Sequence, residues 1–317
     1  MKKPCVLCTL LLTLAAAQVF TDGSERQVLR VPDDFATIQQ AVDAAAPGDV
    51  IMVAPGTYCE QVSIMTSDLT LRAAPAVGNP AILSGACETG GFGVHSHGIS
   101  VTGVSGVEIS GFTIEGFATG IFLQSTTESR IFGNEIRHNV YLGSSPLFAA
   151  DAVGIFLRTD SNFHEIQQNW IHDNGHLGIG LWNGNNSNLI RANWLIDNQT
   201  QQGTYPSFAC ALMLWGTTNR DNWIVENEVT NSLSVGGSGI MIGGGMQMGN
   251  VVAQNRVHGH LLRGIVVMSG SHDNVIEQNN ATGNGIAGGV DLSDASVLPN
   301  LWQRNLGTCA PSNAGCD

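Results

Sequence analysis

A four-residue pattern of glycine, an apolar residue, any residue and a second apolar residue recurs along most of this chain. Its shortest spacings, such as 98 to 120, 154 to 178 and 239 to 264, are 22 to 25 residues. The segments begin at Gly98, Gly120, Gly154, Gly178, Ala211, Gly239, Gly264 and Gly289. A fixed period of this length, carried by short alternating segments, indicates that one structural unit is stacked many times.

A second short segment, which starts with asparagine, follows each of these. The starting residues are Asn134, Asn169, Asn193, Asn227 and Asn255, and a further column precedes them at Asn188, Asn222, Asn250, Asn274 and Asn300. No helical period separates the segments, so the repeat predicts a parallel β-solenoid of about ten coils, stacked at ~4.8 Å. Asparagines at one corner of successive coils can adopt a left-handed backbone and bond one another. We therefore predict structural asparagine ladders.

The chain begins with two lysines, an apolar run and the small residues Ala15 to Ala17. This is the pattern of a secretory signal peptide over residues 1–17, too short to span a membrane, with one domain over 18–317. Lys2 and Lys3 are the only lysines among 13 basic residues, against 26 acidic ones. An acidic, secreted or periplasmic protein is predicted, and nucleic acid and membrane insertion are excluded as modes of action.

Five cysteines follow the predicted signal peptide. In an oxidising compartment we expect Cys59–Cys87 to join neighbouring segments and Cys309–Cys316 to close the tail. Cys210 is then left over as a buried, inert thiol. Near the start, an apolar face of residues 35, 38, 42 and 45 lies behind Asp33 and Asp34. It predicts a short helix, ended by Pro47-Gly48, that caps the first coil.

The stretch VPDDFATIQQAVDAAAPGDVIMVAPGTYCEQVSI, followed by the repeated G-I-x-L and N-x-I segments, resembles the right-handed parallel β-helix superfamily over residues 30–308. That superfamily includes pectate lyases, polyuronate epimerases, pectin methylesterases and NosD-like periplasmic proteins. The resemblance implies the right-handed β-helix fold. The catalytic motifs of the pectin methylesterases, mannuronan epimerases and polygalacturonases are absent, and lyases that use a lysine base are excluded by the lack of lysine beyond the predicted signal peptide.

Two insertions lengthen the repeat, at residues 139–151 and 199–210. Both come after the second segment and before the next first segment, so they should project from the same corner and flank a binding surface. Alternation along the first segments places Arg158, Trp182 and Trp215 outward on successive coils, flanked by Phe156 and Met213. Indoles beside an arginine suit the apolar face and the carboxylate of an acidic sugar. We therefore predict a polysaccharide platform here.

Ionisable residues occur in the same coils. Arg158 would neutralise a uronate carboxylate, His172 or His176 would act as the base, and Asp151 would be the acid or a Ca²⁺ ligand. Asp173 or Asp160 could pair with Asp151 if the reaction were hydrolysis. This set favours a lyase or epimerase acting on an acidic glycan over a glycoside hydrolase, which needs two carboxylates beside the scissile bond. Calcium is the cofactor we would expect, since it could bridge an anionic substrate to an acidic protein.

Non-catalytic alternatives exist for these residues. The indoles Trp182 and Trp215 could form a side core under the insertions, and His172 and Asp173 could simply decorate a turn. Trp170 and Trp194 are interpreted as stacked packing on adjacent coils. His258, His260 and several methionines leave open a metal-binding, NosD-like role, and a β-helix can also bind glycan or a partner protein without catalysis. Oligomeric state is not predicted.

Overall fold

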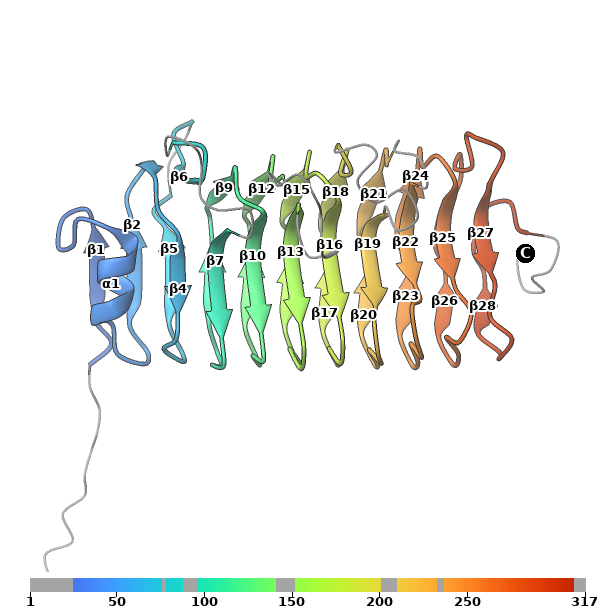
Figure 1. Ribbon diagram of the computed structural model, residues 1–317, viewed down its shortest axis with the longest axis horizontal. Coiled ribbons are helices and arrows are strands. Elements are labelled where there is room, and N and C mark those ends of the chain that lie inside the picture. The colour runs from blue at the N-terminus through green and yellow to red at the C-terminus, as the bar shows by residue number, and fades with distance from the viewer. Residues whose placement is uncertain are drawn as a thin grey trace, which may run out of the picture.

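The computed structural model describes residues 25–75, 78–87, 96–140, 152–200, 210–232 and 237–310. Within them, strands form three parallel sheets that run the length of an elongated molecule (Figure 1). Each coil of the central part contributes one strand to each sheet, the end coils contribute fewer, and the pairings join one coil to the next. The predicted parallel β-helix is therefore confirmed, and the predicted signal peptide, residues 1–17, lies outside the described residues.

The strands of the three sheets have the following bounds. The eleven-stranded sheet contains β1 (Val28–Val31), β2 (Val50–Val53), β5 (Thr70–Ala73), β8 (Glu108–Ser110), β11 (Arg130–Phe132), β14 (Glu165–Gln167), β17 (Leu189–Arg191), β20 (Trp223–Val225), β23 (Val251–Ala253), β26 (Val275–Glu277) and β28 (Leu301–Gln303). The nine-stranded sheet contains β4 (Val62–Ile64), β7 (His97–Thr102), β10 (Thr119–Gln124), β13 (Val153–Arg158), β16 (Leu177–Trp182), β19 (Cys210–Trp215), β22 (Ser238–Ile242), β25 (Arg263–Val267) and β27 (Val290–Asp294). The eight-stranded sheet contains β3 (Gly56–Tyr58), β6 (Ala81–Ser84), β9 (Thr113–Glu115), β12 (Glu135–Arg137), β15 (Trp170–His172), β18 (Trp194–Ile196), β21 (Glu228–Thr230) and β24 (Arg256–His258).

The interior of the coil is filled by aliphatic columns from all three sheets. On β16, for example, Ile179 and Leu181 are fully buried and belong to this core. They align with Ile155 and Leu157 of the preceding coil. Since every coil adds the same aliphatic residues at the same register, burial of apolar surface is repeated along the whole solenoid.

The asparagine ladders are present and lie inside the corners. In one ladder the side-chain amide of Asn169 donates to Asn193 Oδ1 at 3.0 Å, and that of Asn193 donates to Asn227 Oδ1 at 3.0 Å. The members of this ladder are Asn134, Asn169, Asn193, Asn227, Asn255, Asn279 and Asn305. Each buried amide therefore satisfies backbone and side-chain groups of the neighbouring coil.

The expected left-handed backbone of the ladder asparagines is wrong. The residue before each ladder position has positive φ instead, as at Gln168, Ala192 and Glu226. That residue turns the chain, and the turn directs the next side chain into the corner, where it can reach the coils on both sides. Ordinary residues such as alanine tolerate the strained position because the ladder bonds fix the corner.

Two histidines occupy positions that belong to asparagine columns. The backbone N–H of His164 donates to Asn188 Oδ1 of the next coil at 2.9 Å. In the same way, the backbone N–H of His260 donates to Asn284 Oδ1 at 3.2 Å. Both rings are buried, and this burial lowers the pKa of each to about 4. This structural role of the two histidines is not visible in the repeat pattern of the sequence.

The short helix α1 (Ile38–Ala44) covers the first coils at the N-terminal end (Figure 1). Thr37 is its N-cap, and Ile38, Ala41 and Val42 are buried beneath it. The carboxylate of Glu60 accepts from the backbone N–H groups of Ile38 and Gln39 at 2.9 and 3.0 Å. The predicted cap is confirmed, and Glu60 is fixed by the free N–H groups of the helix start.

The cysteine predictions are confirmed where the structure describes both residues. Cys59 and Cys87 form a disulfide with an S–S distance of 2.07 Å. Cys210 is buried, as predicted, and burial raises the pKa of its thiol, which disfavours the reactive thiolate. Cys309 is also disulfide-bonded, while its predicted partner Cys316 lies outside the described residues. In the described part of the chain, no helix has the length and apolar character needed to cross a membrane.

Candidate functional site

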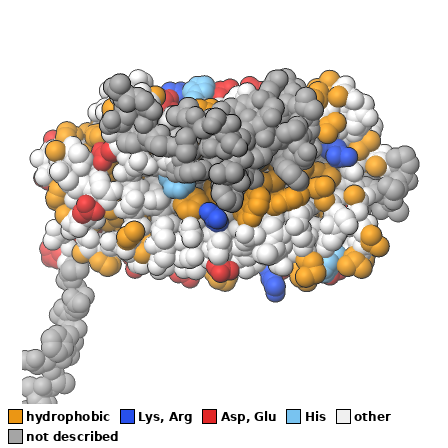
Figure 2. Space-filling model, in the orientation of Figure 1, with side chains coloured by type: hydrophobic (Ala, Val, Ile, Leu, Met, Phe, Trp, Pro, Cys, Tyr) orange, Lys and Arg blue, Asp and Glu red, His pale blue; other side chains and the backbone are white. Residues whose placement is uncertain are grey.

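The predicted outward columns lie in register on the nine-stranded sheet. Arg158 is paired with Trp182, and Trp182 with Trp215. The neighbouring outward column contains Ser100, Phe122, Phe156, Gly180, Met213, Met241 and Val266. In Figure 2 an apolar band crosses this face over β10 to β25, with basic groups beside it.

The column that contains Arg158 places one cationic side chain next to two indoles on successive coils. We call Arg158, Trp182 and Trp215 the arginine–indole edge, since each is the last residue of its strand. The two indole centroids are 6.5 Å apart and their planes are inclined by 53°. Both indoles are partly buried, so each keeps a face or edge for contact with a ligand.

Glycines of the following coil seat the indoles. A Cβ placed on Gly216 would lie 3.0 Å from Trp182 Cδ1, and one on Gly244 would lie 2.3 Å from the ring atoms of Trp215. Any side chain at Gly244 would therefore displace the Trp215 indole. The two glycines hold the indoles in a defined orientation, which is a property of packing and of a prearranged binding surface alike.

Phe156 and Met213 do not flank the edge as exposed residues. Each is 1% exposed and belongs to an apolar cluster on the outward side of the sheet, together with Phe122 and Met241. The ring of Phe156 fills the space left by Gly180, where an added Cβ would lie 2.9 Å from Phe156 Cδ2. The predicted exposure of Phe156 and Met213 is wrong, because this part of the face is itself a second core. They support the indoles from below.

Arg158 is exposed at the end of β13 and makes no ion pair with any residue that the structure describes. Several other arginines on the strands are ion-paired, in contrast to Arg158. Arg137, for instance, is bonded to Glu135 and Glu115, and although partial burial lowers its pKa, these bonds produce a net upward shift. A guanidinium without a described carboxylate partner, next to two indoles, is available to an anionic ligand.

The predicted bases do not lie beside Arg158. His176 precedes Leu177, at one end of β16, whereas Arg158 aligns with Trp182 at the other end. At ~3.3 Å per residue the six residues from 176 to 182 span roughly 20 Å. His172 lies on β15 of the eight-stranded sheet, a different face. The proximity of these residues in sequence therefore does not place them around one sugar.

His172 belongs instead to a charged cluster that sequence analysis missed. Its Nδ1 lies 2.7 Å from Asp173 Oδ2 and its Nε2 lies 3.2 Å from Glu135 Oε1. Glu135 also bonds Arg137 at 2.7 Å, and the ring of Trp170 stacks on His172 with centroids 4.2 Å apart. The sequence signal that could have revealed this cluster is the alternation along residues 135–137, which places Glu135 and Arg137 outward and Ile136 inward.

The remaining predicted groups are placed as follows. Asp151 lies outside the described residues, and Asp173 has positive φ at the corner after β15. His260 is buried in a ladder and Met241 in the apolar cluster, so neither is exposed for a metal. Among the described residues, no group of three or more His, Cys, Asp and Glu is arranged to hold a metal ion.

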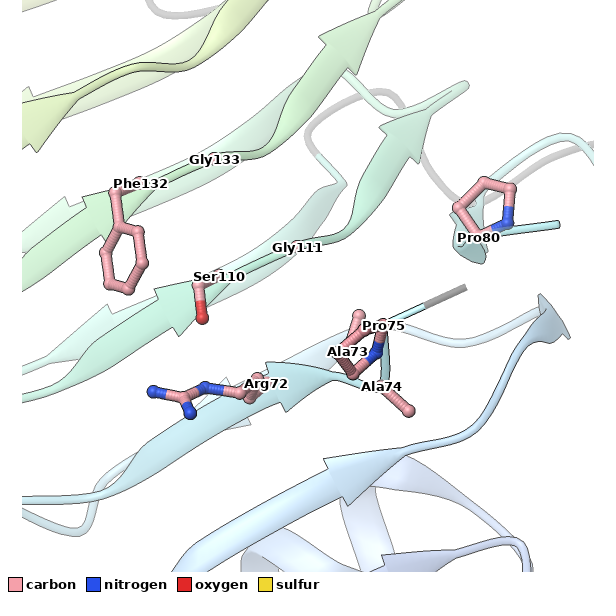
Figure 3. A pocket seen from close by; sticks show the side chains of 9 residues that line it. All are labelled: Arg72, Ala73, Ala74, Pro75, Pro80, Ser110, Gly111, Phe132 and Gly133. Atoms are coloured by element: carbon pink, nitrogen blue, oxygen red, sulfur yellow. The ribbon is translucent and has the colours of Figure 1, made fainter. Parts of the chain in front are cut away.

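Two surface depressions lie away from the arginine–indole edge. One, of about 410 Å³, is lined by Arg72, Ser110, Phe132 and Pro80 and opens between the strands shown in Figure 3. Its arginine is already bonded to Glu108 at 2.7 Å. The other, of about 350 Å³, is lined by Arg256, His258, Gly259, Asn280, Thr282 and Gly283.

Comparison with known proteins identifies the fold. The family model described as right handed beta helix region matches residues 81–229. The chain has the right-handed parallel β-helix fold. No curated protein matches it significantly in sequence.

Solved structures with this fold include several enzymes that act on carbohydrates. An alginate lyase from Paenibacillus sp. str. FPU-7 is 17% identical with a TM-score of 0.53, over 84% of this chain and 98% of that one. The pectate lyase Pel9A is 12% identical with a TM-score of 0.58, over 93% and 79%. The DFA-IIIase from Arthrobacter chlorophenolicus A6 is 15% identical with a TM-score of 0.55, over 92% and 86%. At these identities the likeness extends to the fold.

Proposed function

We propose that this is a secreted or periplasmic protein that recognises an acidic, uronate-containing polysaccharide at the arginine–indole edge. The carrying observation is the exposed Arg158, without an ion-pair partner among the described residues, in register with two indoles. The guanidinium would pair with a uronate carboxylate through two parallel hydrogen bonds, while the indoles contact the apolar faces of the sugar rings. Neighbouring coils would hold neighbouring sugars.

The reaction we propose for such a substrate is β-elimination or epimerisation. Pairing of Arg158 with the carboxylate would make the C5 proton of that uronate more acidic, because the guanidinium stabilises the charge that develops on proton removal. A base beside the sugar would take this proton. In a lyase the C5 carbanion would then expel the O4 substituent, whose oxygen takes a proton from an acid or water, whereas in an epimerase a proton would return to C5 from the opposite side. Support for the lyase class comes from the alginate lyase and pectate lyase that share the fold.

Glycan binding without turnover is the second candidate. The observation that favours it is the separation of Arg158 from His172 and His176 by the length or the face of a sheet. Proton transfer at a sugar bound to Arg158 needs a group close to that sugar, and these two histidines are not. Recognition of the glycan, unlike turnover, needs only Arg158 and the two indoles.

A uronate-polymer screen separates the two candidates. The protein would be incubated with alginate, polygalacturonate and a neutral β-glucan, each with and without Ca²⁺. Unsaturated ends would be read by absorbance, reducing ends by colorimetry and epimer content by NMR. A lyase produces unsaturated ends, and an epimerase changes only the epimer ratio. A binder changes neither but is retarded by the acidic polymer in affinity electrophoresis. The proposal would be contradicted if neither acidic polymer retards the protein and neither is chemically changed by it.

A further inference from the structure

The outer face of the eight-stranded sheet carries a second pair of exposed indoles. Trp170 on β15 and Trp194 on β18 are paired in register, and they are 47% and 48% exposed. They do not form the indole stack expected from the sequence, since Trp170 stacks on His172 instead. Large aromatic side chains this exposed on adjacent coils leave a broad apolar surface in solvent.

Matching charged groups close both ends of this surface. Glu135 aligns with Trp170 on one side, and Glu228 aligns with Trp194 on the other. Each glutamate is held by a histidine and an arginine: Glu135 by His172 and Arg137, and Glu228 by His258 at 2.8 Å and Arg256 at 3.3 Å. Fixed carboxylates and cations at both ends offer acceptors and donors for hydroxyl groups.

The strip continues into a depression. Arg256 follows Glu228 in register, and it lines the cavity of about 350 Å³ together with His258 and Asn280. From Trp170 to Arg256 the strip crosses three coil steps, which is roughly 14 Å at ~4.8 Å per step. That step is close to the length of one sugar unit in an extended chain, so the strip can hold a few consecutive sugars.

The charge of this face decides which glycan fits it. Both of its arginines, Arg137 and Arg256, are already bonded to glutamates. Asp173 and the exposed Asp197 add carboxylates at the corner beside the indoles. Since neither arginine of this face is left unpaired among the residues that the structure describes, a polyanion would be repelled, in contrast to the arginine–indole edge.

We propose that the strip of Trp170, Trp194, Glu228 and Arg256 binds a neutral, extended polysaccharide with β-linked pyranose units. The apolar ring faces stack on the indoles, and the hydroxyls bond to the flanking glutamate, histidine and arginine side chains. This site does not rest on the proposed function, because it lies on another sheet and takes a ligand of different charge.

Retention on neutral polysaccharides tests this proposal. Full-length protein would be run through gels containing soluble β-glucan or xylan and incubated with insoluble cellulose and chitin. We expect retention on at least one, and a loss of at least about tenfold in affinity for Trp170→Ala and for Trp194→Ala. Added NaCl should change this binding little, because no net charge is paired. Trp223→Ala is the matched control, since Trp223 is 54% exposed on the eleven-stranded sheet.

Several outcomes would overturn the proposal. They are no retention on any of the four polysaccharides, retention that both tryptophan variants keep, or an equal loss in Trp223→Ala. Circular dichroism and thermal unfolding of each variant establish that the fold is intact, and Trp194→Phe, which keeps a stacking ring, should retain most of the binding. Trp182→Ala should leave neutral retention unchanged. That variant separates this site from the arginine–indole edge, which is tested on uronate polymers.

Discussion

The Nδ1 atom of His164 accepts a hydrogen bond from the backbone N–H of Ser129 at 3.0 Å, in a corner column that is otherwise continued by asparagine. His260 accepts from the backbone N–H of Ser232 at 3.2 Å in another column. A buried ring nitrogen that accepts a hydrogen bond cannot take a proton without losing that bond. We therefore expect both histidines to make the solenoid sensitive to acid.

The first prediction is the sign of this pH dependence. Burial holds the pKa of both rings at about 4 in the folded chain, below the ~6.5 expected when unfolded. The unfolded chain therefore takes up these protons first. Their stabilisation is complete above about pH 6.5, falls as the pH drops towards 4, and levels off below that. For each histidine, this difference in pKa corresponds to a loss of roughly 3 kcal/mol in the free energy of unfolding at low pH.

Urea unfolding of the wild type and of His164→Asn between about pH 7.5 and pH 4 checks this prediction. Asparagine suits the column and does not titrate, so the variant should lose less stability on acidification. An identical pH dependence in both proteins would mean that His164 does not govern acid sensitivity.

The second prediction concerns the ladders. Asn193→Ala removes the acceptor for the backbone N–H and side chain of Asn169 and a donor to Asn227 Oδ1. Several buried groups lose partners, so we expect a loss of at least about 3 kcal/mol in the free energy of unfolding. Arg191→Ala, an exposed change two residues away, should cost less than about 1 kcal/mol. Chemical denaturation distinguishes them, and equal losses would show that the ladder contributes little.

The third prediction concerns the N-terminal cap. Glu60→Ala leaves two N–H groups at the start of α1 without their carboxylate acceptor. We expect a destabilisation of about 1–2 kcal/mol and easier proteolysis near residues 38–44. Limited proteolysis with mass spectrometry locates the first cleavage. Unchanged stability together with an unchanged cleavage pattern would indicate that Thr37 alone caps the helix.

The fold could be predicted because its causes repeat along the sequence. Spacing gave the coils, alternation gave the outward column of Arg158, Trp182 and Trp215, and the asparagines gave the ladders. His164 could not be recognised as a ladder member, since a histidine in place of asparagine breaks the visible pattern.

The candidate site was harder to predict than the fold. His172 is close to Arg158 in sequence, but the coil passes through β14 between them and places His172 on another face. Phe156 looked exposed by alternation alone, yet it belongs to a second apolar cluster on the outer side of the sheet. The alternation of residues along a strand predicts which way a side chain points. It does not predict whether an outward side chain is buried, because that depends on contacts with neighbouring coils and loops.

The fourth prediction tests whether Trp182 and Trp215 bind glycan or serve only as core residues. Trp182→Ala and Trp215→Ala should each weaken retention on an acidic glycan, at roughly 1–3 kcal/mol by analogy with aromatic stacking on bases. Because both indoles are only partly buried, the fold should persist. Affinity electrophoresis and circular dichroism report the two properties independently. Wild-type binding by both variants, or unfolding of both, would show that the indoles are core residues.

The measurement closest to the central claim is the affinity of Arg158→Ala for polygalacturonate and alginate, compared with that of Arg191→Ala. Arg191 is also exposed at the end of a strand but is bonded to Glu226 at 2.7 Å on the eleven-stranded sheet. Recognition of a uronate carboxylate by Arg158 predicts at least a tenfold loss of affinity for Arg158→Ala, partial rescue by Arg158→Lys, wild-type binding by Arg191→Ala, and a wild-type affinity that falls with added salt. Equal affinity of Arg158→Ala and the wild type for both polymers would contradict the account.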